Sequence, residues 1–220
     1  MKKLVAIYTG QGLAEPLQKL IQSELPGLWL VNIIDDGIIH DVIKAGGVTN
    51  PVRRRLIKYY QIAVEIGADL ILNTCSSVGE VVDLGRALID VPIVKIDEPM
   101  AKHAAANYQR IGVVATLPTT LEPTARLVQA QAQTLGKDIT IIDGLAEGAY
   151  HALINGRADE HDQLIMEVGR RLAEQVDCIV LAQASMMRMQ QKLAETANVT
   201  VLSSPPLCVA HLKTMLERGI

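Results

Sequence analysis

An internal repeat constrains the fold of this 220-residue chain more than any other feature of its sequence. Three blocks recur in the same order at an offset of 107 or 108 residues: 5–22 with 112–129, 69–77 with 177–185, and 93–94 with 201–202. Self-similarity at one offset is typical of a duplicated structural unit. The sequence therefore predicts two similar lobes.

Short apolar runs alternate with helix-like stretches in both halves of the chain. The runs, each interpreted as a buried strand, are Leu4–Tyr8, Trp29–Ile34, Leu70–Leu72, Ile93–Ile96, Ile111–Val114, Ile139–Ile142, Cys178–Leu181 and Val199–Leu202. The helix-like stretches include Leu13–Glu24, Pro51–Ile66, Ser77–Leu88, Thr124–Leu135, His161–Gln175 and Met187–Ala197, and Cys208 opens a last helix. This alternation favours an α/β fold with two pseudo-symmetric lobes, each a mainly parallel sheet flanked by helices. We place the N-terminal lobe at residues 1–98 plus 205–220 and the C-terminal lobe at residues 99–204.

Composition and charge exclude several classes of protein. Hydrophobic residues make up 49% of the chain and charged residues 20%, which is the composition of a folded globular protein. The net charge of −3 lacks the basic excess that binding to a nucleic-acid backbone requires. No segment approaches the roughly 18 uninterrupted apolar residues of a membrane span, and the run Leu4–Tyr8 is too short for a signal peptide. We therefore expect a cytoplasmic protein that binds neither nucleic acid nor membranes.

Polar residues follow four of the predicted strands. In open parallel sheets, ligands bind at the carboxyl ends of the strands. Those ends carry Thr9, the turn Asn73-Thr74-Cys75-Ser76, the turn Thr116–Thr120, and Gln183-Ala184-Ser185. We expect the lobes to face each other, so that these loops form an active site in the cleft between them, with Cys75 and Gln183 in repeat-equivalent positions.

Cys75 is the candidate catalytic residue of this site. A cysteine between a strand and a helix N-terminus is favoured as a thiolate, which can act as a base or a nucleophile. Uncharged donors around it suit a carboxylate ligand, because they hold the anion without adding a positive charge beside the thiol. The predicted substrate-binding residues are Thr9, Asn73, Thr74, Ser76, Thr116, Thr119, Thr120, Gln183 and Ser185. We interpret Cys178 and Cys208 as packing residues, and the three cysteines fit neither a disulfide framework nor a zinc-binding spacing.

The motifs Asn73-Thr74-Cys75-Ser76, Thr116–Thr120 and Val180–Met186 resemble those of the aspartate/glutamate racemase superfamily. This superfamily includes glutamate, aspartate and hydantoin racemases, maleate isomerases and arylmalonate decarboxylases, and the resemblance covers essentially the whole chain. It implies an enzyme without a cofactor, in which two thiols flank the α-carbon of the substrate. One thiol removes a proton and the other returns one to the opposite face. The resemblance also implies a homo-oligomer.

The second thiol of that superfamily is absent from this sequence. Its position is occupied by Gln183, and an amide does not act as an acid or a base at neutral pH. The resemblance implies a racemase-like or isomerase-like enzyme that acts next to the carboxylate of a small amino acid or related acid through Cys75. Two alternatives remain open: a one-thiol decarboxylase or isomerase, and a carboxylate-binding protein without catalysis.

Inversion of a stereocentre would require a second acid opposite Cys75. The candidates are Ser185, His151, His161 and the pair Asp35-Asp36. Each also has a structural interpretation: Ser185 hydrogen-bonds a ligand, His161 lies in the solvated first turn of a helix, and the two aspartates are solvated or cap a helix.

Two other motifs carry no catalytic prediction. The loop Gly10-Gln11-Gly12 lacks the third glycine of a dinucleotide-binding fingerprint, so we expect no nucleotide cofactor there. The run Arg53-Arg54-Arg55 is interpreted as a solvated or subunit-contacting helix face.

Overall fold

The computed structural model describes residues 1–219, which divide into two compact units. The N-terminal unit, Met1–Ile96 together with the segment from Pro205 onward, contains β1 (Lys3–Tyr8), α1 (Ala14–Glu24), β2 (Trp29–Ile34), α2 (Gly37–Ala45), α3 (Asn50–Glu65), β3 (Leu70–Asn73), η1 (Ser76–Val78), α4 (Glu80–Leu88), β4 (Ile93–Lys95) and α10 (Ser204–Glu217). The C-terminal unit, Asp97–Ser204, contains α5 (Glu98–Asn107), β5 (Arg110–Ala115), α6 (Pro118–Thr134), β6 (Thr140–Leu145), α7 (Ala149–Ile154), α8 (Ala158–Ala173), β7 (Cys178–Leu181), η2 (Ala184–Met189), α9 (Gln190–Ala197) and β8 (Thr200–Ser203).

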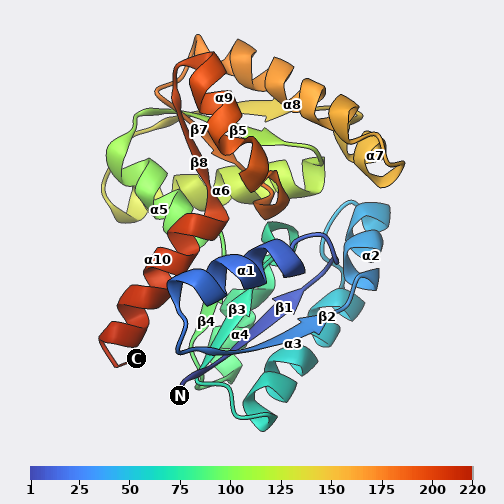
Figure 1. The fold of residues 1–220 in the computed structure, drawn as a ribbon, viewed down its shortest axis with the longest axis vertical. Helices are drawn as coiled ribbons and strands as arrows, with labels where there is room; N and C mark the ends of the chain where they lie inside the picture. The colour runs from blue at the N-terminus through green and yellow to red at the C-terminus, as the bar shows by residue number, and fades with distance from the viewer. Residues whose placement is uncertain (220) are drawn as a thin grey trace. The chain divides into compact units, whose positions relative to one another are not determined.

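Each unit is built on a four-stranded sheet in which every pairing is parallel. The strand order is β2-β1-β3-β4 in the N-terminal unit and β6-β5-β7-β8 in the C-terminal unit. In Figure 1, β4, β3, β1 and β2 can be followed from left to right across the N-terminal unit. The predicted α/β fold with two parallel-sheet lobes flanked by helices is therefore confirmed.

Corresponding hydrogen bonds recur in the two sheets. The amide of Lys3 donates to Asp69 Oδ2 over 2.7 Å, and the amide of Arg110 donates to Asp177 Oδ2 over 2.9 Å. Both aspartates precede the third strand of their unit, and both contacts tie that strand to the start of the first. The repeated sequence blocks thus carry matching local contacts, which supports the inferred duplication.

Helices cover the sheets because the inner strands are apolar on both faces. In the N-terminal unit, Ile7 and Ile71 belong to a core cluster with residues of α2, α3 and α4. In the C-terminal unit, one cluster joins Ile179 to α7, α8 and α9, and a second joins Val113 to α6. These clusters pack helices against the central strands of both sheets and so help to fix the carboxyl ends of those strands.

Two expectations about individual elements are wrong, and three helices were not predicted. The run Trp29–Ile34 is a strand but not a buried one, because β2 lies at the edge of its sheet, and both Trp29 and Ile34 are exposed. Helix α6 begins at Pro118 rather than at Thr124, since proline is well suited to the first turn of a helix. The short helices α2, α5 and α7 had no counterpart among the predicted elements.

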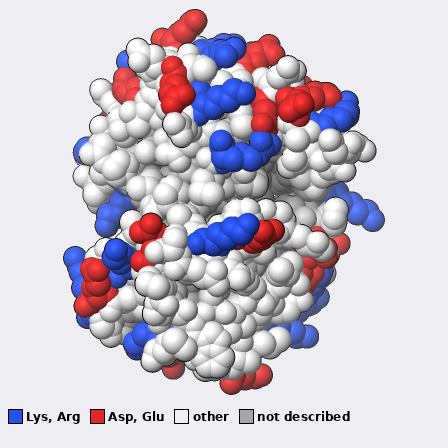
Figure 2. Space-filling model, viewed as in Figure 1, with Lys and Arg blue, Asp and Glu red and all other residues white. Residues whose placement is uncertain are grey.

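Surface features agree with the modest net charge. On the face shown in Figure 2, lysine and arginine side chains are interspersed with aspartate and glutamate, and no continuous basic surface forms there. Among residues 1–219, no helix has the length and apolar character needed to cross a membrane.

Candidate active site

Cys75 lies two residues beyond β3, at the carboxyl end of the N-terminal sheet, and is partly exposed. Its backbone is extended, with φ −125° and ψ 117°, and its carbonyl accepts the amide of Val78 over 3.4 Å. The helix expected directly after Cys75 is a single 3₁₀ turn, η1, because the amide of Gly79 bonds to the carbonyl of Ser76 three residues earlier. The α-helix begins only at Glu80, so Cys75 does not directly precede the N-terminus of a long helix.

Asn73 uses its side chain within the protein. The residue is 1% exposed, its Oδ1 accepts the hydroxyl of Tyr60 over 3.1 Å, and its Nδ2 donates to the carbonyl of Cys75 over 3.0 Å. The predicted carboxylate donor is thus a buried link between α3 and the peptide of Cys75.

Thr74 joins the same turn to the neighbouring strand β1. Its hydroxyl and its amide both donate to the carbonyl of Ile7, over 2.9 and 3.1 Å. Thr9, which follows β1, and Ser76 are buried at the same edge of the sheet. The structure therefore brings the four predicted polar residues of this unit together around Cys75, with the hydroxyl of Thr74 already engaged.

The other two cysteines lie in the core. Cys178 on β7 is fully buried, and this burial, with a smaller contribution from the charge of Asp177, raises the pKa of its thiol to about 12. Cys208 on α10 is also fully buried. Of the three cysteines, Cys75 alone is partly exposed.

In the C-terminal unit, Gln183 and Thr116 contact each other. Gln183 Oε1 accepts the amide of Thr116 over 3.1 Å, and its Nε2 donates to Thr116 Oγ1 over 2.7 Å. Both polar ends of the glutamine amide are therefore engaged, whereas the hydroxyl of Thr116 accepts in this contact and keeps its own hydrogen to donate. Ser185, two residues further along, is exposed at the start of η2.

Thr119 and Thr120 belong to the first turn of α6 rather than to a loop. Thr120 is buried. The hydroxyl of Thr119 is buried and finds no hydrogen-bond partner within residues 1–219. This oxygen is a donor that the protein itself does not satisfy.

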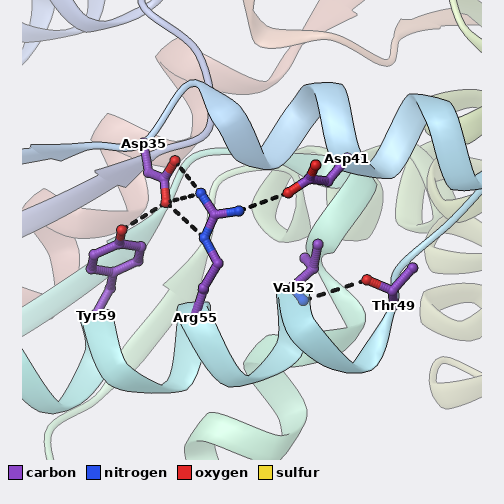
Figure 3. A network of polar contacts seen from close by, with 6 residues as sticks. All are labelled: Asp35, Asp41, Thr49, Val52, Arg55 and Tyr59. Carbon is purple, nitrogen blue, oxygen red and sulfur yellow. Dashed lines mark hydrogen bonds and ion pairs between the residues drawn. The ribbon is translucent and has the colours of Figure 1, made fainter.

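Asp35 is held in an ion-pair network that makes it unsuitable as a general acid (Figure 3). It accepts Nε of Arg55 over 3.1 Å and the hydroxyl of Tyr59 over 2.6 Å, while Arg55 also reaches Asp41 over 2.7 Å. Burial raises the pKa of the Asp35 carboxyl, but the hydrogen bonds from Tyr59 and Arg55 and the charge of Arg55 outweigh it and lower the pKa below its ordinary value. Arg55 is consequently a half-buried structural residue, not part of a solvated arginine face.

The other candidates for a second acid were Asp36, His161 and His151. Asp36 is exposed and accepts the side-chain amide of Gln11 over 2.6 Å. The expectation that His161 is solvated is wrong: it is 3% exposed and its Nδ1 lies 2.8 Å from Asp162, because η2 packs over the start of α8 through an ion pair between Arg188 and Asp162. His151 is exposed on α7.

Two buried polar residues near Cys75 were not identified from the sequence. Tyr60 is fully buried on α3 and contacts Asn73, and Lys95 lies at the end of β4, in register with Asn73. Lys95 is 7% exposed and pairs with Asp83 over 2.8 Å. The available signal for Lys95 was a charged residue inside the apolar run Ile93–Ile96, and the signal for Tyr60 was an aromatic residue on the apolar face of a helix.

No group of three or more histidine, cysteine, aspartate or glutamate side chains suited to a metal ion occurs among residues 1–219. The polar groups at the strand ends of each unit are hydroxyls and a side-chain amide, joined in the N-terminal unit by the thiol of Cys75.

Comparisons with known proteins place this geometry in context. A glutamate racemase isoform from Bacillus anthracis superposes with a TM-score of 0.81 at 13% identity, over 99% of this chain and 82% of that one. An allantoin racemase from Klebsiella pneumoniae gives a TM-score of 0.71 at 16% identity over 100% and 89% of the two chains. The aspartate racemase of Picrophilus torridus gives 0.71 at 14% identity over 97% and 94%. These likenesses show a shared fold.

Sequence comparison identifies the family. Among curated proteins, none matches this chain. The model of the Asp/Glu/hydantoin racemase family matches residues 30–212, which include the Cys75 turn, the Thr116 turn and Gln183. Because this match spans most of the chain, the protein belongs to the Asp/Glu/hydantoin racemase family.

Proposed function

We propose that this protein is a cofactor-independent enzyme that moves a proton at the carbon next to the carboxylate of a small amino acid or related acid, with Cys75 as acid and base. The observation that carries the proposal is the position of Cys75. It is a partly exposed thiol at the carboxyl end of a central strand, in a chain that belongs to a racemase family, whereas Cys178 and Cys208 are buried.

The hydrogen bonds of the polar residues suggest which of them stabilise the turn and which bind the substrate. Asn73 and Thr74 serve the turn itself, since their side chains bond within the protein. The hydroxyls of Thr116 and Thr119 are the better candidates for holding a carboxylate, because each has a hydrogen to donate. Thr9, Ser76, Thr120 and Ser185 stay in the proposal as substrate-binding residues on the strength of the sequence.

A second candidate function follows from Gln183. Its amide is engaged at both ends by Thr116 and has no acid or base chemistry at neutral pH. With one thiol, a proton can leave the α-carbon for the sulfur of Cys75 and return from the same sulfur to a different atom of the resulting enediolate, which isomerises the substrate. The same thiol can protonate the carbanion that forms when a carbon–carboxylate bond breaks and carbon dioxide leaves. An isomerase or decarboxylase that works on one face of its substrate is therefore the alternative to a racemase.

Proton NMR in heavy water distinguishes these functions. A panel of single enantiomers of amino acids and hydroxy acids, with substituted malonates, would be incubated with the wild type, with Cys75→Ser and with Cys178→Ala as a control that keeps the accessible thiol. Deuterium uptake with inversion supports a racemase, and uptake or loss of carbon dioxide without inversion supports one-faced chemistry. In either case Cys75→Ser should abolish the reaction and Cys178→Ala should retain it.

Two results would contradict the proposal. Reaction that survives in Cys75→Ser would remove Cys75 from the mechanism. Binding of a carboxylate without deuterium exchange across the panel would favour a binding protein.

A further inference from the structure

Tyr60 is an unusual polar group in the core of the N-terminal unit. It is fully buried on α3, and its hydroxyl donates to Asn73 Oδ1 over 3.1 Å. A buried hydroxyl group needs a hydrogen-bond partner, and the partner of Tyr60 is the side chain of Asn73, at the end of β3 and two residues before Cys75. The hydroxyl therefore links α3 to the turn that contains Cys75.

Asn73 continues this contact to Cys75. Its Nδ2 donates to the carbonyl of Cys75 over 3.0 Å, and its backbone carbonyl accepts the amide of Ile96 over 3.0 Å. Asn73 is 1% exposed, so its side-chain amide cannot exchange these partners for water without local opening. The orientation of the Cys75 peptide is thus fixed through Asn73, and the orientation of the Asn73 amide is fixed by Tyr60.

The ring of Tyr60 is itself tightly confined. A Cβ atom added at Gly85 of α4 would lie 2.7 Å from its Cδ2 atom, so glycine allows the ring to fit there. Cys75 packs against the same core cluster. Burial, and next the charge of a Cys75 thiolate, raise the pKa of the Tyr60 hydroxyl well above its ordinary range. Tyr60 consequently remains a neutral donor at any working pH.

We infer that Tyr60 is a positioning residue for Cys75, which it holds through the side-chain amide of Asn73. The role of these contacts in catalysis rests on the proposed function of Cys75. Their effect on the reactivity of the Cys75 thiol is independent of that proposal, because this reactivity is measured without a substrate. Loss of the Tyr60 hydroxyl frees the Asn73 amide to turn, and the peptide groups around the sulfur then lose the fixed orientation that favours a thiolate.

The test compares Tyr60→Phe with Tyr59→Phe. Both substitutions remove one hydroxyl from adjacent positions of α3, but the hydroxyl of Tyr59 bonds to Asp35 and not to Asn73. The rate at which iodoacetamide alkylates Cys75 would be followed between pH 5 and 10 by mass spectrometry of the Cys75 peptide. We expect Tyr60→Phe to move the pH midpoint of Cys75 alkylation upward by about 0.5 units, a loss of about threefold in rate at neutral pH, and Tyr59→Phe to leave it unchanged.

A double-mutant cycle tests the route through Asn73. If Tyr60 acts through that amide, Tyr60→Phe has no further effect on Cys75 alkylation in an Asn73→Ala background. A full effect in that background would overturn the relay, as would a midpoint for Tyr60→Phe that equals those of the wild type and Tyr59→Phe. If Asn73→Ala does not fold, the comparison of the two tyrosine variants alone decides the inference.

Turnover of any substrate found in the deuterium experiment provides a second readout. We expect Tyr60→Phe to lower kcat and leave KM near the wild-type value, because the substrate-binding hydroxyls are unchanged. Failure of the proposed function appears as exchange that persists in Cys75→Ser. Failure of the relay appears as unchanged Cys75 alkylation in Tyr60→Phe, so the two failures are distinguishable.

Discussion

Gln183 and Thr116 hold each other through two hydrogen bonds, although 67 residues separate them in the sequence. The glutamine amide accepts the backbone N–H of Thr116 and donates to its hydroxyl oxygen. Gln183, which corresponds to Cys75 in the repeat, therefore orients the hydroxyl of Thr116. A primary amide suits this role because it can donate one hydrogen bond and accept another at the same time.

Replacement of Gln183 by leucine should destabilise the protein. The substitution keeps the approximate volume but leaves the N–H of the buried Thr116 without its acceptor. We expect the free energy of unfolding in urea to fall by about 1–3 kcal/mol, the usual cost of an unsatisfied buried polar group. The matched control is Gln191→Leu, because Gln191 is exposed and its amide donates to the exposed Glu195, so a change within about 0.5 kcal/mol is expected. Equal losses in the two variants would show that the contact with Thr116 contributes nothing to stability.

The fold was largely predictable because its strands are apolar. Runs such as Leu70–Leu72 and Cys178–Leu181 are buried on both faces, and this leaves a clear signal in the sequence. The helix α2 was missed because its nine residues begin with Gly37 and include β-branched residues that give no helical signal by themselves.

The positions of the candidate residues at strand ends were predictable, but their contacts were not. In a parallel sheet, the residues after β3 and β7 lie at the carboxyl ends of strands, and this rule predicted the positions of Cys75 and Gln183. The contact of Asn73 with Tyr60 and the burial of His161 beneath Arg188 depend on how α3 and α8 pack. Such contacts join residues distant in sequence, and no local pattern encodes them.

The cysteines should differ sharply in reactivity. Burial raises the pKa of Cys178 to about 12, so very little thiolate exists there at pH 8 and no reagent reaches it in the folded state. We expect iodoacetamide to alkylate Cys75 at least about 100-fold faster than Cys178 at pH 8. Mass spectrometry of the three cysteine peptides over time measures both rates. In urea the three rates should converge, and comparable slow rates in the native protein would contradict the accessible position of Cys75.

Asp35 should make stability depend on pH. Its pKa in the folded protein is lowered below the ordinary value of 3.8, so the folded state favours the carboxylate. The stabilisation is therefore fully present above about pH 4 and is lost as the pH falls through the lower folded-state pKa. We expect Asp35→Asn to lower the free energy of unfolding by about 1–2 kcal/mol at pH 7, a value reduced by the partial exposure of Arg55.

The difference between the wild type and Asp35→Asn should shrink steadily below pH 4. Urea unfolding at pH 7, 5, 4 and 3 measures it. The neighbouring variant Asp36→Asn is the control, because Asp36 is exposed and accepts a hydrogen bond from the uncharged side chain of Gln11. A constant difference across this pH range would mean that Asp35 stabilises the fold by packing rather than by its charge.

Gly85 should not tolerate alanine, although alanine is the better helix former by about 1 kcal/mol. A Cβ atom there would lie 2.7 and 2.9 Å from the ring of Tyr60 and 2.9 Å from Cδ1 of Ile93. The ring cannot yield easily, because it is fully buried and its hydroxyl is bonded to Asn73. We expect Gly85→Ala to cost about 1–3 kcal/mol in urea unfolding, as overpacked cores do. Gly27→Ala is the comparison, since a Cβ atom added at Gly27 would meet no atom within 4 Å, and its loss should be smaller. Because a displaced Tyr60 would also release Asn73, Gly85→Ala should slow Cys75 alkylation in the same direction as Tyr60→Phe. A Gly85→Ala protein with wild-type stability and wild-type Cys75 alkylation would mean that the ring has room to move and does not hold the turn.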